Sequence, residues 1–399
     1  MSQAIQKSVG TVAKPAERFY FPELDLLRFF AFFAVFIHHW IKFYNEPGVL
    51  GVVGNAGAFG VDLFFTLSGY LITRLLLRER DETGDINLKN FYVRRTLRIW
   101  PLYYFSIALA FLLSQLPASL TSAPPFVANI FGSPMPAIGY FFMATFVYNF
   151  NFYGTLLTNP PPFMGQLWSL SVEEQFYLFW PWFARYVPRR RVVVVPILMI
   201  AVACVVRATL KFDMQRLMWE YTFVRIDPIA VGILIALLPA LKLGRGLRLL
   251  LFLAGIASWG FAAGYCGIPI ETVEYSTLKI SLGFPAIALG SGAFLLATLG
   301  TKSLNPRSSL VRSLVYLGKI SYGLYMYNTI ATNTAHLLQF RGALRLPVLG
   351  SWSLWTESVL AILISFGLNV ALAAASYRWL EAPFLRLKER FARVPSRAV

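Results

Sequence analysis

Ten long apolar stretches recur along this chain, and they restrict the folds that it can adopt. Each is close to the length of about 17 to 25 residues that an α-helix needs to cross a bilayer. They lie near residues 24–43, 58–77, 100–116, 168–187, 192–210, 226–241, 247–265, 280–299, 320–339 and 355–377. Because backbone polar groups in lipid must be satisfied internally, the pattern predicts an all-α, polytopic membrane bundle of about ten transmembrane helices.

The composition agrees with a membrane protein, since 57% of the 399 residues are hydrophobic and 14% are charged. The net charge of +17 is interpreted as a topology signal and not as nucleic-acid binding, because Lys and Arg collect in cytoplasmic loops. With ten spans, most basic residues fall on one side, together with both termini. They lie in the tails and in the expected loops 78–99, 185–191, 242–248 and 300–319.

This topology predicts three parts of the chain. They are a cytoplasmic N-terminal tail (1–22), a membrane-embedded domain (23–384) and a cytoplasmic C-terminal tail (385–399). A further apolar segment, 137–150, is not counted as a span, because counting it would invert every later loop. The surrounding connection, 116–167, has no charged side chain, and we expect it to fold back onto the membrane and line an acceptor pocket.

The first apolar stretch carries Arg28 and His39, eleven residues apart. At about 100° per residue they fall roughly 20° from each other on one helix face, about 16 Å apart along its axis. Ionisable groups at membrane depth are costly and usually functional. The pair predicts a buried polar stripe, although Arg28 could instead snorkel to the headgroups while His39 caps the far end of the span.

The second stretch begins with the sequence GVDLFFTLSG, which sets Asp62 within an otherwise apolar helix. Asp62 could hold a histidine or arginine partner, or it could cap the start of the helix. The glycines permit close helix packing and need no ligand. We treat Asp62 and Ser68 as candidate substrate-binding residues.

Three guanidinium groups lie close together before the third span, at Arg94, Arg95 and Arg98. Such a group suits bidentate binding of phosphate or pyrophosphate. The alternative is an ordinary positive anchor with an aromatic belt at the membrane surface. The sequence of this segment does not decide between them.

The fourth stretch contains WSLSVEEQFY, with the adjacent carboxylates Glu173 and Glu174 inside a membrane helix. Each needs a partner or a proton. They point about 100° apart, so at most one can share the stripe of His39. Trp168 and Glu174 are further substrate-binding candidates, and a polar transport pathway would predict the same set of buried charges.

Taken together, these segments resemble the acyltransferase-three family of integral membrane acyltransferases. The resemblance extends from about Leu24 to Phe384 and preserves the family's order of motifs. The motifs are Arg28-x10-His39, GVDLFFTLSG, Arg95-x-x-Arg98, WSLSVEEQFY and the closing SYRWLEAP.

The resemblance implies a bacterial inner-membrane enzyme that moves an acyl group, expected to be acetyl, from cytoplasmic acyl-CoA to a hydroxyl. The acceptor would be a cell-envelope glycan, a lipid-linked sugar or a similar molecule, and no bound cofactor or metal is expected. The residues that the resemblance places in the active site are His39, its paired Arg28, the acidic Glu173 and the cytoplasmic Arg95 and Arg98. Asn328 departs from the pattern, since many relatives have histidine there.

Two roles stay open for His39. Its neutral imidazole could deprotonate an acceptor hydroxyl as a general base, or it could accept the acyl group covalently. Glu173 or Asp62 would then orient the ring, as a carboxylate orients histidine in hydrolase triads. A multi-span transporter or flippase of a polysaccharide intermediate is the alternative function.

Overall fold

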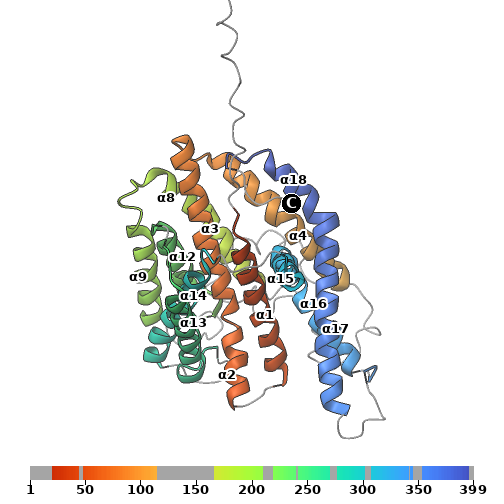
Figure 1. Ribbon diagram of the computed structural model, residues 1–399. Helices are drawn as coiled ribbons and strands as arrows, with labels where there is room; N and C mark the ends of the chain where they lie inside the picture. The colour runs from red at the N-terminus through yellow and green to blue at the C-terminus, as the bar shows by residue number, and fades with distance from the viewer. Residues whose placement is uncertain are drawn as a thin grey trace, which may run out of the picture.

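The computed structural model describes residues 20–44, 48–114, 166–209, 219–239, 241–269, 276–301, 307–340, 342–344 and 353–394. Within these ranges every regular element is helical, so the predicted all-α class is confirmed (Figure 1). In chain order the elements are α1 (Pro22–Tyr44), α2 (Gly48–Gly57), α3 (Gly60–Thr83), α4 (Leu88–Ser114), α8 (Leu167–Tyr186), α9 (Val194–Thr209), α11 (Thr222–Arg225), α12 (Asp227–Leu237), α13 (Arg245–Gly260), the π-helical turn η1 (Phe261–Tyr265), α14 (Thr277–Thr298), α15 (Ser309–Lys319), α16 (Ser321–Phe340), α17 (Ser353–Ser376), the π-helical turn η3 (Tyr377–Glu381) and α18 (Ala382–Glu389).

A helix occupies each of the ten predicted apolar stretches. Five helical segments are long and apolar enough to cross a membrane: Pro22–Ile41, Gly48–Thr83, Arg245–Tyr265, Thr277–Thr298 and Glu357–Glu389. The helices α9 and α12 are apolar but shorter. The chain is therefore built as a multi-pass membrane protein, while the count of ten crossings and the side of the termini stay predictions.

Two segments that we expected to be loops are mostly helical. The expected loop 78–99 is taken up by the end of α3 and the start of α4, which leave a turn of a few residues between them. The expected loop 300–319 contains α15. Charged residues such as Arg, Glu and Lys are good helix formers, so a membrane helix can continue into the aqueous phase. The connection 116–167 and the segment 137–150 lie almost wholly outside the described residues.

The helices α3 and α12 form the most extensive contact in the bundle. A Cβ at Gly69 of α3 would overlap the carbonyl oxygen of Ile229, and one at Gly232 of α12 would overlap that of Thr66. Small residues at a membrane helix crossing let the backbones approach closely. The packing role expected for the glycines of the second stretch is confirmed at Gly69.

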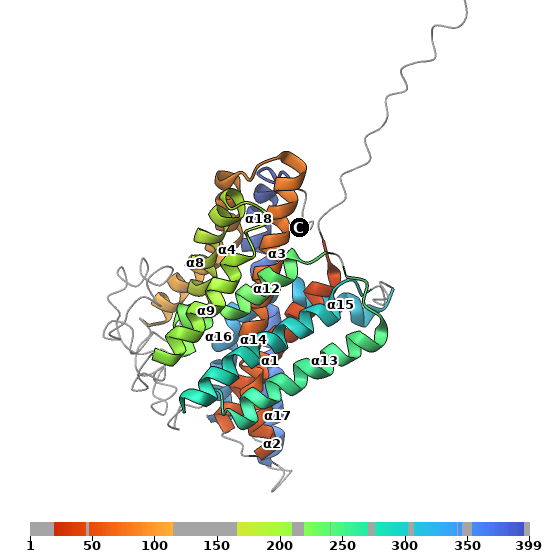
Figure 2. The same ribbon diagram turned by 90° about the vertical axis from the view of Figure 1, so that its left-hand side faces the viewer.

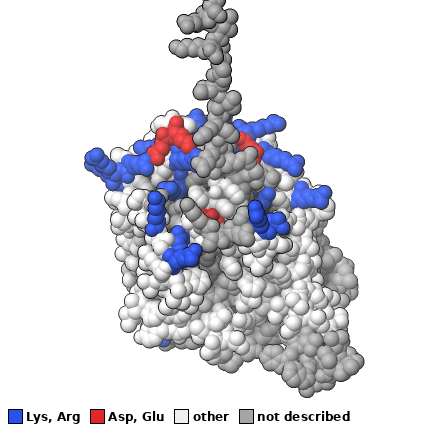
Figure 3. All heavy atoms as spheres, in the orientation of Figure 1, with Lys and Arg blue, Asp and Glu red and all other residues white. Residues whose placement is uncertain are grey.

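Outside this pair, α1 is packed by α2, α3 and α15, while α16 pairs with α17 and α13 pairs with α14. The α13–α14 pair lies on one flank of the bundle (Figure 2). Lys and Arg side chains gather mainly around one end of the molecule on the face seen in Figure 3. That end carries the α3–α4 turn and α18 (Figure 1). We refer to it as the basic end.

Candidate functional site

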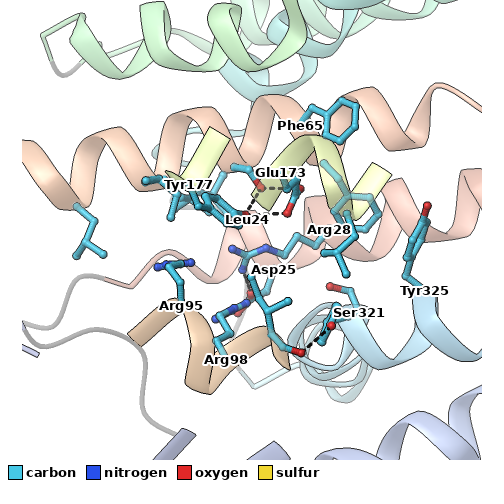
Figure 4. Close-up of a pocket in the computed structure, with 18 of the residues that line it drawn as sticks. Leu24, Asp25, Arg28, Phe65, Arg95, Arg98, Glu173, Tyr177, Ser321 and Tyr325 are labelled. Atoms are coloured by element: carbon cyan, nitrogen blue, oxygen red, sulfur yellow. Dashed lines mark hydrogen bonds and ion pairs between the residues drawn. The ribbon is translucent and has the colours of Figure 1, made fainter. Parts of the chain in front are cut away.

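A cavity of about 220 Å³ opens among α1, α3, α4, α8 and α16, with η3 and α18 at its border. Most of its wall is apolar, and six charged side chains line it: Asp25, Arg28, Arg95, Arg98, Glu173 and Lys388. Figure 4 shows the first five of these around one space between the helices. The cavity therefore brings together residues from all five sequence motifs, including Ser68 of GVDLFFTLSG and Tyr377 of SYRWLEAP.

Arg95 and Arg98 lie one turn apart on α4, so their side chains share a helix face. The guanidinium carbon of Arg95 lies 5.6 Å from the ring centroids of both Phe91 and Tyr177. Such contacts hold a cation by its attraction to the aromatic face. The Nε atom of Arg95 is buried without a hydrogen-bond partner among the described residues, so this arginine keeps donor capacity beside the cavity.

Glu173 faces the same cavity from α8 and accepts two side-chain hydrogen bonds. Ser68 Oγ donates to Glu173 Oε1 over 2.8 Å, and the Tyr177 hydroxyl donates to Oε2 over 2.7 Å. These contacts fix both carboxylate oxygens within a helix that is otherwise apolar. The structure thus gives Glu173 a serine and a tyrosine as partners, in place of the histidine that we expected it to orient.

The adjacent Glu174 turns away from the cavity. It is buried beside Trp100 of α4, and its Oε1 has no hydrogen-bond partner among the described residues. This agrees with the expectation that only one of the two glutamates can share the functional face. Glu174 does not line the cavity, so a direct contact with a ligand there is not supported.

Arg28 lines the cavity from α1 and forms an ion pair with Asp25, with 2.5 Å between Nη1 and Oδ1. Its side chain is 20% exposed, whereas that of Asp25 is 1% exposed. Arg28 therefore faces the space between the helices. The sequence did not point to Asp25, although its spacing of three residues from Arg28 places both on one face.

His39 lies outside the lining of this cavity, farther along α1, and its side chain is exposed. Its Nδ1 lies 2.8 Å from the carbonyl oxygen of Val35 and 3.4 Å from Nδ2 of Asn328. Because a carbonyl oxygen only accepts, the shorter contact requires a proton on Nδ1. The lone pair of the neutral ring then resides on Nε2, which is the nitrogen able to act as a base.

Polar side chains of α8 and α16 meet at one part of the cavity wall. The hydroxyls of Ser169 and Tyr325 are 2.7 Å apart, and both reach the carbonyl oxygen of Gln166, over 3.0 and 3.2 Å. Tyr325 and Ser169 also line the cavity. Asn328, the neighbour of His39, lies one turn beyond Tyr325 on the same face of α16. This face therefore leads from the inner end of the cavity to the histidine.

Arg94 has a different environment from Arg95 and Arg98. It is buried, with Nη2 3.0 Å from Glu79 Oε2 and Nη1 donating to the carbonyl oxygen of Phe391 over 2.8 Å. Glu79 also accepts from the backbone N–H of Asn87 over 2.9 Å. The predicted role of Arg94 in binding substrate is not supported, because neighbouring helix positions point about 100° apart and this one faces a buried carboxylate.

Asp62 is also removed from the cavity, and its partner is an arginine. Its Oδ2 accepts from Nη2 of Arg225 over 2.8 Å, while Arg207 Nη1 lies 3.1 Å from Asp227 Oδ2. We call these four residues, none more than 2% exposed, the sealed cluster. Both arginines of this cluster are completely buried.

Aromatic rings enclose the sealed cluster. The guanidinium carbon of Arg225 lies 4.0 Å from the ring centroid of Trp219, 5.3 Å from that of Phe284 and 5.6 Å from that of Trp168. Trp168 therefore packs on this cluster and does not line the cavity, so its predicted contact with substrate is not supported. Among the described residues, no group of His, Cys, Asp and Glu could hold a metal ion.

Besides Asp25, the cavity residues Tyr177, Tyr325 and Lys388 were not predicted from the sequence. Tyr177 is four residues from Glu173, so helical spacing could have paired them. Tyr325 carries a hydroxyl among apolar neighbours and gave only a weak signal. Lys388 had no signal at all, because it lies in a segment that we expected to be a cytoplasmic tail.

The comparison with known proteins agrees with the sequence motifs. A family model described as an acyltransferase domain matches residues 21–374. The chain is similar to the peptidoglycan O-acetyltransferase OatA of Listeria monocytogenes, with 35% identity over 166 residues, or 42% of this chain and 24% of that protein. It is also similar to the O-acetyltransferase OatA of Staphylococcus aureus, with 26% identity over 91% of this chain and 57% of that protein. No solved structure matches the chain.

These relatives extend beyond the region of similarity, since this chain spans little more than half of the staphylococcal protein and a quarter of the listerial one. The family match over residues 21–374 includes α1, α3, α4, α8 and α16, the helices that build the cavity.

Proposed function

This chain belongs to the acyltransferase-three family, and we propose that it is an O-acetyltransferase of a bacterial cytoplasmic membrane. In this proposal it transfers an acetyl group from acetyl-CoA to a hydroxyl of a cell-envelope glycan. The family assignment rests on the match over residues 21–374. The names of the two relatives support O-acetyl transfer, and that of the listerial protein supports a glycan acceptor.

The observation that carries the proposal is the charge of the cavity wall. Four basic side chains and two acidic ones line it, an excess of two positive charges in a space with mainly apolar walls. Arginine forms bidentate, charge-assisted hydrogen bonds with phosphate oxygens. A ligand that carries phosphates at one end and a thin, largely apolar arm at the other, as acetyl-CoA does, matches this combination.

The direction of entry is proposed from the positive-inside rule. Arg95 and Arg98 lie near the start of α4, at the basic end of the molecule (Figures 1 and 3). Basic residues of membrane proteins are enriched on the cytoplasmic side. The donor would therefore bind with its phosphates at the cytoplasmic border and its thioester directed along the cavity.

The thioester would reach His39 along the face of α16. Hydrogen bonds join Ser169, Tyr325 and Gln166 on this face, and we propose that binding of the donor displaces the Tyr325 side chain. The spacing of Arg28 and His39 along α1, about 16 Å, sets the distance that the pantetheine arm would cover.

At His39 the chemistry follows from the proton on Nδ1. The Nε2 lone pair takes the proton of the acceptor hydroxyl while its oxygen attacks the thioester carbonyl. The new C–O bond forms, the C–S bond breaks, and the imidazolium returns the proton to the leaving thiolate. The products are CoA and the O-acetyl ester. Trapping an acetyl group on His39 with acetyl-CoA alone would select the covalent alternative.

The proposal is tested with the full chain in lipid nanodiscs, by following release of the CoA thiol from acetyl-CoA in the presence of cell-envelope glycan fragments. Mass spectrometry of the fragments measures the gain of one acetyl group. We expect His39→Ala to lower turnover by about 10² to 10⁴. A chain that transports glycan without consuming thioester, or a His39→Ala variant with full turnover, would overturn the proposal.

A further inference from the structure

Lys388 of α18 is a third basic residue at the cavity border, besides Arg95 and Arg98 of α4. It is 8% exposed, whereas its neighbours Arg386 and Arg390 are exposed. The helix therefore buries one cation and leaves the others in solvent. Its side chain lines the same cavity as the two arginines, so the three basic groups border one space.

The local structure around the closing motif explains how α18 reaches the cavity. After α17 the chain passes through the π-helical turn η3, and Pro383 then occupies the first turn of α18. A π-helical turn changes the direction of a helix, and proline is accepted in a first turn because no hydrogen bond is lost there. As a result α18 lies along α4 and not in the solvent (Figure 1).

A buried ion pair then anchors the end of α18. Arg94 donates to the carbonyl oxygen of Phe391, just beyond α18, while Glu79 of α3 holds the same guanidinium group. The adjacent Arg95 faces the cavity. Arg94 thus fixes the helix that carries Lys388, and Arg95 lines the same cavity as Lys388.

We propose that Lys388 binds a phosphate group of the acyl-CoA donor, together with Arg95 and Arg98. This inference rests on the proposed function, since it takes acetyl-CoA as the donor. CoA carries three phosphate groups, two in a pyrophosphate and one on the ribose. Two arginines one turn apart suit the pyrophosphate, because their forks accept adjacent oxygens. A lysine on another helix supplies a separate point charge for the ribose phosphate.

The experiment compares Lys388→Gln with Arg386→Gln, which removes the same charge from the same helix on its exposed side. Binding of CoA, 3′-dephospho-CoA and phosphate-free pantetheine to the full chain in nanodiscs is measured by calorimetry. We expect Lys388→Gln to weaken CoA about tenfold or more, and 3′-dephospho-CoA far less, since a hydrogen bond to a charged group is removed only with the former. Arg386→Gln should leave all three unchanged, and Lys388→Arg should restore most of the affinity for CoA.

Equal weakening of CoA and 3′-dephospho-CoA, or no weakening of either, would overturn the inference while leaving the proposed function intact. If pantetheine binding weakened to the same degree, Lys388 would act by packing. This result would also overturn the inference while leaving the proposed function intact. If the wild-type chain bound CoA no better than pantetheine, the proposed donor itself would be wrong. Thermal unfolding of each variant shows whether α18 stays in place.

Discussion

The sealed cluster and the cavity both place charged side chains inside the helical bundle, but they differ in net charge and in access to open space. The sealed cluster has two arginines and two aspartates, so its formal charges cancel, and each of its residues is at most 2% exposed. The cavity keeps an excess of two positive charges, and its charged groups border open space. Both regions contain arginines that contact aromatic rings, so residue type alone does not separate them.

The two regions differ in which groups balance their charges. In the sealed cluster the partners are already present in Asp62 and Asp227, and removing one would leave a buried charge without compensation. In the cavity the basic side chains outnumber the acidic ones by two. Under the proposed function, a bound anionic ligand would balance this excess.

The largest effect is expected from Arg225→Leu, which leaves Asp62 buried without its partner. Breaking a buried ion pair costs about 3 to 5 kcal/mol. The free energy of unfolding, measured by denaturant titration in mixed micelles, should fall by this amount. The double variant Asp62→Leu/Arg225→Leu should recover part of it, because both charges are then absent. Arg190→Leu, at an exposed position, is the control. Loss of CoA affinity without loss of stability would reverse the assignment of the two regions.

The sequence located the helices well, because the bilayer imposes a length on each apolar stretch. Helical periodicity also separated Glu173, which lines the cavity, from Glu174, which does not. Which charged residues pair with each other was harder to predict. Asp62 and Arg225 meet across 163 positions of the chain, and nothing in either local segment specifies the other.

The same limit explains Arg94 and Arg95. Adjacent arginines in a basic segment look alike in sequence. Only the packing around α4 distinguishes them, since Arg94 meets the buried Glu79 of α3 and Arg95 lines the cavity. Lys388 reaches the cavity because of the direction that the chain takes after η3, and the hydropathy of the sequence does not predict this direction. The contact between His39 of α1 and Asn328 of α16 was not predicted either, because it joins two segments far apart in the chain.

Adjacent arginines allow a second comparison within one segment of α4. Arg95→Ala should lower the affinity for acetyl-CoA about 10- to 100-fold with little change in stability, since it removes charge-assisted hydrogen bonds to a ligand. Arg94→Ala should instead lower the free energy of unfolding by about 3 kcal/mol, because Glu79 loses its partner. Michaelis constants and denaturant midpoints are measured for both variants. Equal effects of the two on donor affinity would argue against separate roles.

Removing a negative charge should have opposite consequences in the two regions. Glu173→Gln keeps hydrogen-bonding capacity toward Ser68 and Tyr177 but increases the positive charge of the cavity, so CoA should bind roughly fivefold tighter, about 1 kcal/mol. Asp62→Asn should destabilise the protein, since Arg225 then keeps a buried charge without an anion. Calorimetry and unfolding report the two effects separately. Weaker CoA binding by Glu173→Gln would show that the carboxylate supports the ligand and does not oppose it.

The smallest effect concerns ionic strength. The Debye length falls from about 10 Å at 0.1 M salt to about 3 Å at 1 M, so charges that face open space are screened while sealed pairs are screened much less. The dissociation constant of CoA should therefore rise several-fold between these salt concentrations, and the stability difference between wild type and Arg225→Leu should stay constant. Phosphate-free pantetheine is the control for salt effects on the protein. If the stability difference shrank in parallel with the affinity for CoA, solvent would reach the sealed cluster. The two regions would then differ only in how far their charges are exposed to solvent.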